Sequence, residues 1–137
     1  RIVNVSSLFG LITPAGQTAY CASKFAVRGF SNALRLELQG TPVGVTVVHP
    51  GGIATDIATS ARSPEGVTEA EKDKQLARAR KMLRMPPGRA AEIILEGIRR
   101  DRARVLVGND ARILSWLERL MPDNYWRLLP GLFNRQD

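Results

Sequence analysis

The chain has 137 residues, 44% of them hydrophobic and 24% charged, a composition typical of one globular domain or part of one, which excludes a disordered or fibrous protein. The single cysteine, Cys21, and the single histidine, His49, exclude an internal disulfide and a closed zinc site. The net charge of +7 has its densest basic stretches at residues 78–84 and 99–104, which lack aromatic residues for base stacking, so no nucleic-acid partner is predicted.

The first elements along the chain are a strand, a helix and a second strand. Residues 2–5 are rich in β-branched side chains, which predicts a buried strand, and a loop follows at residues 6–16. Residues 18–38 predict a helix and residues 43–48 a second buried strand. Two parallel strands joined by a helix form the building block of a doubly wound α/β fold. The apolar residues of the predicted helix recur at steps of three or four: Ala22, Phe25, Ala26, Gly29, Phe30, Ala33, Leu34 and Leu38.

The second half of the chain predicts more helix than strand. An exposed loop over residues 54–65 precedes a polar helix at residues 68–83, and the next helix begins at Pro87. Residues 104–107 predict a third short strand. Asp110 is expected to cap a closing amphipathic helix, whose predicted apolar face consists of Ile113, Leu114, Leu117 and Leu120.

Three side chains in the first half carry the predicted chemistry. Tyr20 and Lys24 are four residues apart, so they lie on the same helix face one turn apart. A free tyrosine, with a pKa of about 10, is a poor base near neutral pH, but a neighbouring ammonium group favours the phenolate and makes a tyrosine usable as a general acid and base. Ser7 follows the first strand, at the edge of a parallel sheet where ligands bind, and its hydroxyl could hold a substrate carbonyl.

These residues belong to a longer pattern, made of residues 2–7 (IVNVSS), residues 20–24 (YCASK) and residues 49–55 (HPGGIAT). The pattern resembles the C-terminal half of the classical short-chain dehydrogenase/reductase family, closely over residues 1–56 and more faintly to about residue 110. The resemblance implies a Rossmann-type doubly wound parallel sheet, of which this chain holds about three strands with flanking helices. It also implies that Ser7 steadies the substrate carbonyl, Tyr20 exchanges the proton, and Lys24 both favours the tyrosinate and holds the nicotinamide ribose.

The resemblance further implies a cofactor, NAD or NADP. In the family the turn after the second of these strands contacts the nicotinamide end, which points to Pro50, Gly51, Ile53 and Thr55 beside Tyr20 and Lys24. The implied reaction is hydride transfer that interconverts a small-molecule alcohol and a ketone or aldehyde.

One domain is expected over residues 1–137, with a catalytic strand-helix-strand at 1–56, a substrate lid at 54–86, and a C-terminal helix and aromatic tail at 110–137. The family's Gly-rich phosphate turn and its fourth catalytic residue, an asparagine, precede the matching part. We therefore expect a C-terminal half that is inactive by itself, and a homo-oligomer at full length.

The tail allows two interpretations, because residues 116–133 combine aromatic residues and leucines with arginines. Packing over the substrate pocket or against another subunit is the first, since Pro122 and Pro130 interrupt any long helix. Peripheral membrane contact through an interfacial helix is the second.

Two other functions remain as alternatives. A non-catalytic module that binds a membrane surface or a partner fits the basic aromatic tail, and a nucleotide-sugar epimerase also uses Tyr-x-x-x-Lys, although residues 50–55 look like the classical dehydrogenases. A serine hydrolase is disfavoured, since Gly-x-Ser-x-Gly is absent and His49, the only available base, is expected to be a packing residue. No signal peptide or spanning run is recognisable, so a cytoplasmic location is expected.

Overall fold

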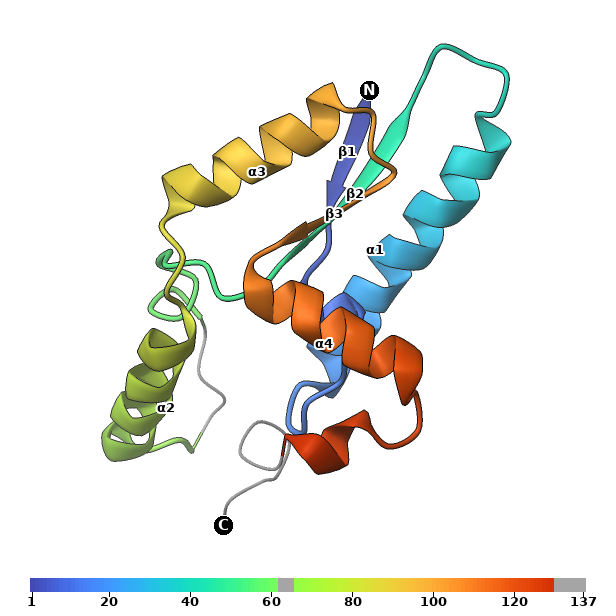
Figure 1. The fold of residues 1–137 in the computed structure, drawn as a ribbon. Helices are drawn as coiled ribbons and strands as arrows, with labels where there is room; N and C mark the ends of the chain where they lie inside the picture. The colour runs from blue at the N-terminus through green and yellow to red at the C-terminus, as the bar shows by residue number, and fades with distance from the viewer. Residues whose placement is uncertain (62–65, 130–137) are drawn as a thin grey trace.

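The computed structural model describes residues 1–61 and 66–129, which form a three-stranded sheet in the order β1-β2-β3 (Figure 1). Strand β1 spans Ile2–Val5, β2 spans Val45–Pro50 and β3 spans Arg104–Val107. Both strand pairs are parallel, as the predicted α/β fold requires.

Helices make the crossovers between these parallel strands. Helix α1 (Thr18–Glu37) joins β1 to β2, whereas α2 (Glu69–Met82) and α3 (Pro87–Arg99) lie between β2 and β3. Helix α4 (Asn109–Leu120) follows β3. The predicted helices and strands are confirmed. Wherever the sequence predicted an end of an element, the structure places that end within two residues of it. No helix among the described residues is long and apolar enough to cross a membrane.

The sheet is covered on both faces, and Figure 1 shows α1 and α3 on opposite sides of the strands. Side chains alternate along β3, so Val105 and Val107 pack with α3 on one face while Leu106 packs towards α4 on the other. Helix α1 shares the α4 face, because Asn4 on β1 donates to the Ser31 hydroxyl of α1 at 3.0 Å. This is the two-sided cover of a doubly wound fold.

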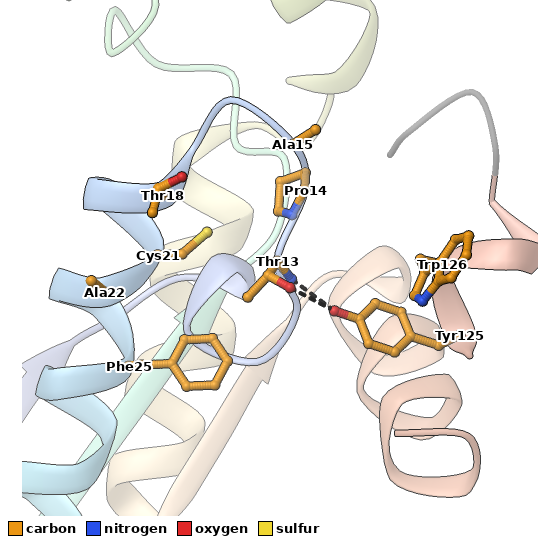
Figure 2. Close-up of a pocket in the computed structure, with 9 residues that line it drawn as sticks. All are labelled: Thr13, Pro14, Ala15, Thr18, Cys21, Ala22, Phe25, Tyr125 and Trp126. Carbon is orange, nitrogen blue, oxygen red and sulfur yellow. Dashed lines mark hydrogen bonds between the residues drawn. The ribbon is translucent and has the colours of Figure 1, made fainter. Parts of the chain in front are cut away.

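Two short 3-10 helices, η1 (Leu8–Gly10) and η2 (Tyr125–Leu128), were not predicted. They share one buried cluster with α4, formed by Leu8, Leu11, Ile12, Ala111, Leu114 and Tyr125. The Tyr125 hydroxyl accepts a hydrogen bond from the Thr13 amide at 3.0 Å and contacts the Thr13 hydroxyl at 3.0 Å (Figure 2). The tail therefore packs on the protein through Tyr125, while Leu132, Phe133 and Arg135 lie outside the described residues.

The predicted apolar face of α1 is not its buried face. Phe30 is 62% exposed and Phe25 is 37% exposed. The stripe that faces the rest of the protein is made of residues next to those of the predicted face in sequence, on the adjacent side of the helix. The buried and half-buried residues of that stripe are Cys21, Lys24, Val27, Arg28 and Ser31. Ser31 and Lys24 reach β1 through Asn4 and the Val5 carbonyl, whereas Arg28 donates to the Gly10 carbonyl of η1. Burial raises the pKa of the Cys21 thiol, as expected for a structural cysteine.

His49 is a fully buried core residue near the end of β2. Its Nδ1 lies 2.9 Å from the carbonyl oxygen of Ser7, and because a carbonyl can only accept, Nδ1 carries the hydrogen. Its buried Nε2 has no hydrogen-bond partner in the described part of the chain. Burial lowers the pKa of His49 below its ordinary 6.5 and outweighs the bond to Ser7, which raises it.

We predict that the free energy of unfolding falls as the pH is lowered from about 7 to about 5, because unfolding frees His49 to bind a proton that the folded state disfavours. One such group contributes at most about 1.4 kcal/mol per pH unit. Urea unfolding at a series of pH values should give a flatter profile for His49→Asn, whose amide can still donate to Ser7. Parallel profiles for the two proteins would show that His49 does not set this dependence.

Candidate active site

Ser7 lies directly after β1, where it begins the 3-10 helix η1. Its half-buried hydroxyl oxygen accepts a hydrogen bond from the Phe9 amide at 3.1 Å, which leaves its own hydrogen to donate. The neighbouring Ser6 is buried, and its hydroxyl already donates to the Lys24 carbonyl at 2.8 Å. Of the two serines, Ser7 is therefore the one able to donate to a ligand.

Tyr20 and Lys24 lie together on α1, as predicted. The Lys24 ammonium is 5.5 Å from the centre of the Tyr20 ring, and it donates to the Val5 carbonyl at 3.4 Å. The Tyr20 ring is 36% exposed and meets the Phe9 ring edge to face, with 6.1 Å between the ring centres. The phenol is thus held from two sides and is still reachable from solvent.

A continuous series of contacts links the three predicted catalytic residues. Ser7 contacts Phe9, Phe9 contacts Tyr20, and Tyr20 lies beside Lys24. Lys24 then returns to Val5 at the end of β1. The carboxyl edge of the sheet therefore carries a hydroxyl donor, a phenol and an ammonium group, a set able to bind and protonate an oxygen atom.

The turn after β2 lies beside this group, because β1 and β2 are parallel neighbours. Gly51 donates to the Val107 carbonyl at 2.9 Å, and Gly52 donates to the Asp110 carboxylate at 2.7 Å. A Cβ atom on Gly52 would collide with the backbone carbonyl of Met82, so the close approach requires glycine at that position, whereas a Cβ atom on Gly51 would displace the Asp110 carboxylate.

The expected cap role of Asp110 is wrong. Helix α4 begins at Asn109, so Gly108, whose φ of 106° suits glycine, occupies the N-cap position and Asp110 lies within the first turn. The Asp110 carboxylate instead binds the amides of Gly52 and of Ala111, the second at 2.9 Å. It fixes the turn of the candidate site from 58 residues away in sequence, a role that no local sequence signal could reveal.

The remaining predicted cofactor residues follow in the same turn. Ile53 forms a parallel bridge with Met85, and its carbonyl accepts from the Thr55 amide at 2.9 Å. The Ile53 amide itself donates no hydrogen bond within the described residues. Pro50 is half-buried at the end of β2, and Thr55 is exposed.

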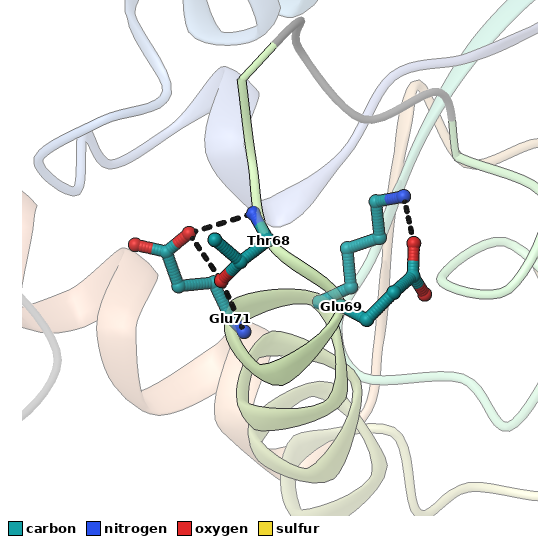
Figure 3. A network of polar contacts seen from close by, with 4 residues as sticks. Thr68, Glu69 and Glu71 are labelled. Carbon is teal, nitrogen blue, oxygen red and sulfur yellow. Dashed lines mark hydrogen bonds and ion pairs between the residues drawn. The ribbon is translucent and has the colours of Figure 1, made fainter.

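The segment expected to be a lid borders this turn. The amides of Arg84 and Met85 donate to the Gly52 carbonyl at 3.1 and 3.0 Å. Helix α2 buries none of its residues, and it begins with a capping box in which Thr68 and Glu71 bond reciprocally (Figure 3). Hydrogen bonds from Thr68 hold the pKa of Glu71 below its ordinary value. The bond from the Thr68 backbone amide contributes most, and the bond from its hydroxyl contributes less. Residues 62–65 of the segment lie outside the described residues.

A cavity of about 550 Å³ is open beside the start of α1 (Figure 2). Its lining is mostly apolar: Thr13, Pro14, Ala15, Thr18, Cys21, Ala22, Phe25, Tyr125 and Trp126. None of the predicted site residues lines it, so it is separate from the edge that carries Ser7 and Tyr20.

Comparison with known proteins adds a family to this geometry. A family model described as short chain dehydrogenase matches residues 1–66. SadH of Mycobacterium tuberculosis is 46% identical over 133 residues, which cover 94% of this chain and 47% of SadH. A dehydrogenase/reductase SDR family protein 7-like of Anopheles gambiae is 32% identical over 130 residues, which cover 94% of this chain and 39% of that protein. The chain therefore spans less than half the length of these curated relatives.

Solved structures share the fold. A short chain dehydrogenase/reductase from Burkholderia phymatum, in complex with NAD, has a TM-score of 0.72 at 22% identity and covers 99% of this chain and 50% of its own. A short chain dehydrogenase from Burkholderia cenocepacia, in complex with NADP, has a TM-score of 0.67 at 20% identity and covers 97% of this chain and 48% of its own. The matching family model, relatives along nearly the whole sequence and the shared fold show that the chain belongs to the short-chain dehydrogenase/reductase family.

Proposed function

We propose that this chain supplies the catalytic half of an NAD(P)-dependent oxidoreductase that interconverts a small-molecule alcohol and a ketone or aldehyde. The observation that carries the proposal is the Lys24 ammonium 5.5 Å from the Tyr20 ring, at the strand end that Ser7 follows. Family membership supports an oxidoreductase, and the two Burkholderia relatives were solved with NAD and with NADP.

The residues after β2 fit the nicotinamide end of such a cofactor. The Ile53 amide is unused within the described residues and lies in a turn that Asp110 holds, so it is available to a carboxamide oxygen. We assign Pro50, Gly51 and Thr55 to the same contact, with Lys24 and Tyr20 at the ribose hydroxyls. When bound, the nicotinamide ring gives or takes the hydride.

The chain's own residues handle the oxygen and its proton. The Ser7 hydroxyl donates a hydrogen bond to the substrate oxygen, because its own oxygen already accepts from Phe9. Tyr20 gives its proton to that oxygen in reduction and takes it back in oxidation. The Lys24 ammonium, 5.5 Å from the centre of the Tyr20 ring, places a positive charge beside the phenol that exchanges the proton.

Two further assignments concern the rest of the protein. We assign the cover of the substrate to residues 54–86, supported by the bonds from Arg84 and Met85 to Gly52 and by the lack of buried residues on α2. We also infer a homo-oligomer at full length, supported by the exposed apolar side of α1, where Phe30 is 62% exposed.

The proton role predicts that Tyr20→Phe in the full-length enzyme lowers turnover by about 10²- to 10⁴-fold, because the ring remains and only the acid–base group is lost. Steady-state kinetics with the best carbonyl substrate measures this. The chain has two tyrosines, so Tyr125→Phe is the matched control, and it should lower thermal stability while retaining most of the turnover. Turnover near the parental value in Tyr20→Phe would remove Tyr20 from the mechanism.

Replacing Lys24 should affect binding and chemistry together. We predict that Lys24→Met weakens cofactor binding and lowers turnover, because the positive charge beside the Tyr20 ring is gone. Calorimetric titration and steady-state kinetics measure the two effects, and the exposed Arg99 on α3 provides the control Arg99→Met. If both variants behave like the parent, Lys24 is a surface charge without a role in the reaction.

The proposal that residues 1–137 alone are inactive has its own test. This sequence contains no G-x-G-x-x-G turn, the element that holds the pyrophosphate of a dinucleotide at a helix N-terminus. We predict no saturable binding of NAD or NADP to residues 1–137 in calorimetric titration, and binding by the full-length protein in the same buffer. Tight binding to the short chain would place the phosphate site within these residues.

A further inference from the structure

Helix α4 is apolar on two sides. Its inward side, with Ala111 and Leu114, is buried in the cluster that contains Tyr125. Its outward side carries Ile113, Trp116 and Leu120, which are 59%, 60% and 70% exposed. The sequence predicted Ile113 and Leu120 for the core together with Leu114 and Leu117, and the structure corrects this. A helix packed on a protein by one side normally presents polar residues on the other.

The outward residues form one stripe along the helix. Steps of three and four residues from Ile113 to Trp116 to Leu120 place these side chains above one another. Arg112 and Arg119, seven residues apart, are both exposed and run along one edge of the stripe. The Arg119 guanidinium lies 5.9 Å from the centre of the Trp116 ring, so charge and aromatic surface are presented together.

Further positive charge lies near one member of this face, Arg119. Burial lowers the pKa of Arg104 on β3, and so do the charges of Arg28 on α1 and Arg119 on α4, which shows that the three guanidinium groups are close enough to repel. Among the groups acting on Arg104, Glu118 is the carboxylate that opposes them. Guanidinium groups of β3 and α1 therefore add positive charge near Arg119, the arginine that contacts Trp116.

We propose that the outward face of α4, formed by Arg112, Ile113, Trp116, Arg119 and Leu120, docks this protein on the surface of a bilayer that contains anionic lipids. Indole and aliphatic side chains suit the boundary between headgroups and acyl chains, and arginines beside them suit lipid phosphates. A second copy of the chain fits less well, since a two-fold interface centred on this stripe would bring the arginines of both copies together. The proposal is independent of the proposed function, because no residue of the stripe belongs to the catalytic group.

The docking is peripheral and shallow. Helix α4 remains attached to the protein through Ala111, Leu114 and the bond from Gly52 to Asp110, so only its outward side chains can enter the lipid. Binding should therefore need both the apolar stripe and the arginines, as single weak anchors give only marginal attachment.

The test is sedimentation of the full-length protein with vesicles of phosphatidylcholine alone and of phosphatidylcholine with phosphatidylglycerol. We expect binding to the anionic vesicles only, and a loss of about thirtyfold in partition for Arg112→Gln/Arg119→Gln, because each basic residue near such a surface contributes about fivefold. Trp116→Ser/Leu120→Ser should abolish binding. Two controls lie at exposed positions elsewhere and should bind like the parent: Lys74→Gln/Arg80→Gln on α2 removes the same charge, and Leu36→Ser on α1 removes one exposed leucine.

A second measurement uses the fluorescence of Trp116 to detect contact between the stripe and lipid. The protein that carries this reporter keeps the stripe residues intact. The 137-residue sequence has two tryptophans, so Trp126→Phe leaves Trp116 as the reporter within it. The double variant Trp116→Phe/Trp126→Phe measures the emission of any tryptophan elsewhere in the full-length protein, and this background is subtracted. Trp116 emission should move to shorter wavelength when anionic vesicles are added. Unchanged emission, or binding that the stripe variants leave intact, overturns the proposal. A dimer that Trp116→Ser dissociates, without vesicle binding, assigns the stripe to a second copy instead.

Discussion

The candidate site depends on the parallel pairing of β1 and β2. Because the two strands run the same way, their carboxyl ends meet at one edge, and the Ser6 amide still donates to the Val48 carbonyl at 2.8 Å beyond the last residue of β1. That bond holds Ser7 next to the turn that begins at Pro50. Ser7 and Pro50, 43 residues apart in sequence, lie at the same edge of the sheet as a result.

One buried and one exposed hydrogen bond then hold the two sides of this edge in place. On one side the His49 ring donates to the Ser7 carbonyl, and on the other the Asp110 carboxylate accepts from the Gly52 amide. A buried polar group that loses its partner costs about 1–3 kcal/mol, so on the His49 side movement of the Ser7 loop away from its partner is resisted. The site residues on exposed loops thus gain rigidity from residues that touch neither substrate nor cofactor.

Local patterns in the sequence were enough to predict the strands, the helices and the Tyr20–Lys24 pair, since each depends on residues close in the chain. Contacts between distant segments were not predictable in this way, as the bonds from Asp110 to Gly52 and from Tyr125 to Thr13 show. Periodicity also failed to identify the buried side of α1. Lys24 and Arg28 are half-buried on that side, and a hydropathy pattern counts both as polar although their aliphatic stems can be buried.

The C-terminal region shows why the two interpretations of the tail are compatible. Tyr125 and Leu114 are buried against the loop between Ser7 and Tyr20, whereas Trp116 and Leu120 on the same segment face outward. Removing the segment would therefore release Thr13 and the site loop at the same time as it removed the outward stripe. Packing and surface docking belong to different sides of one helix, so only substitutions confined to one side can separate them.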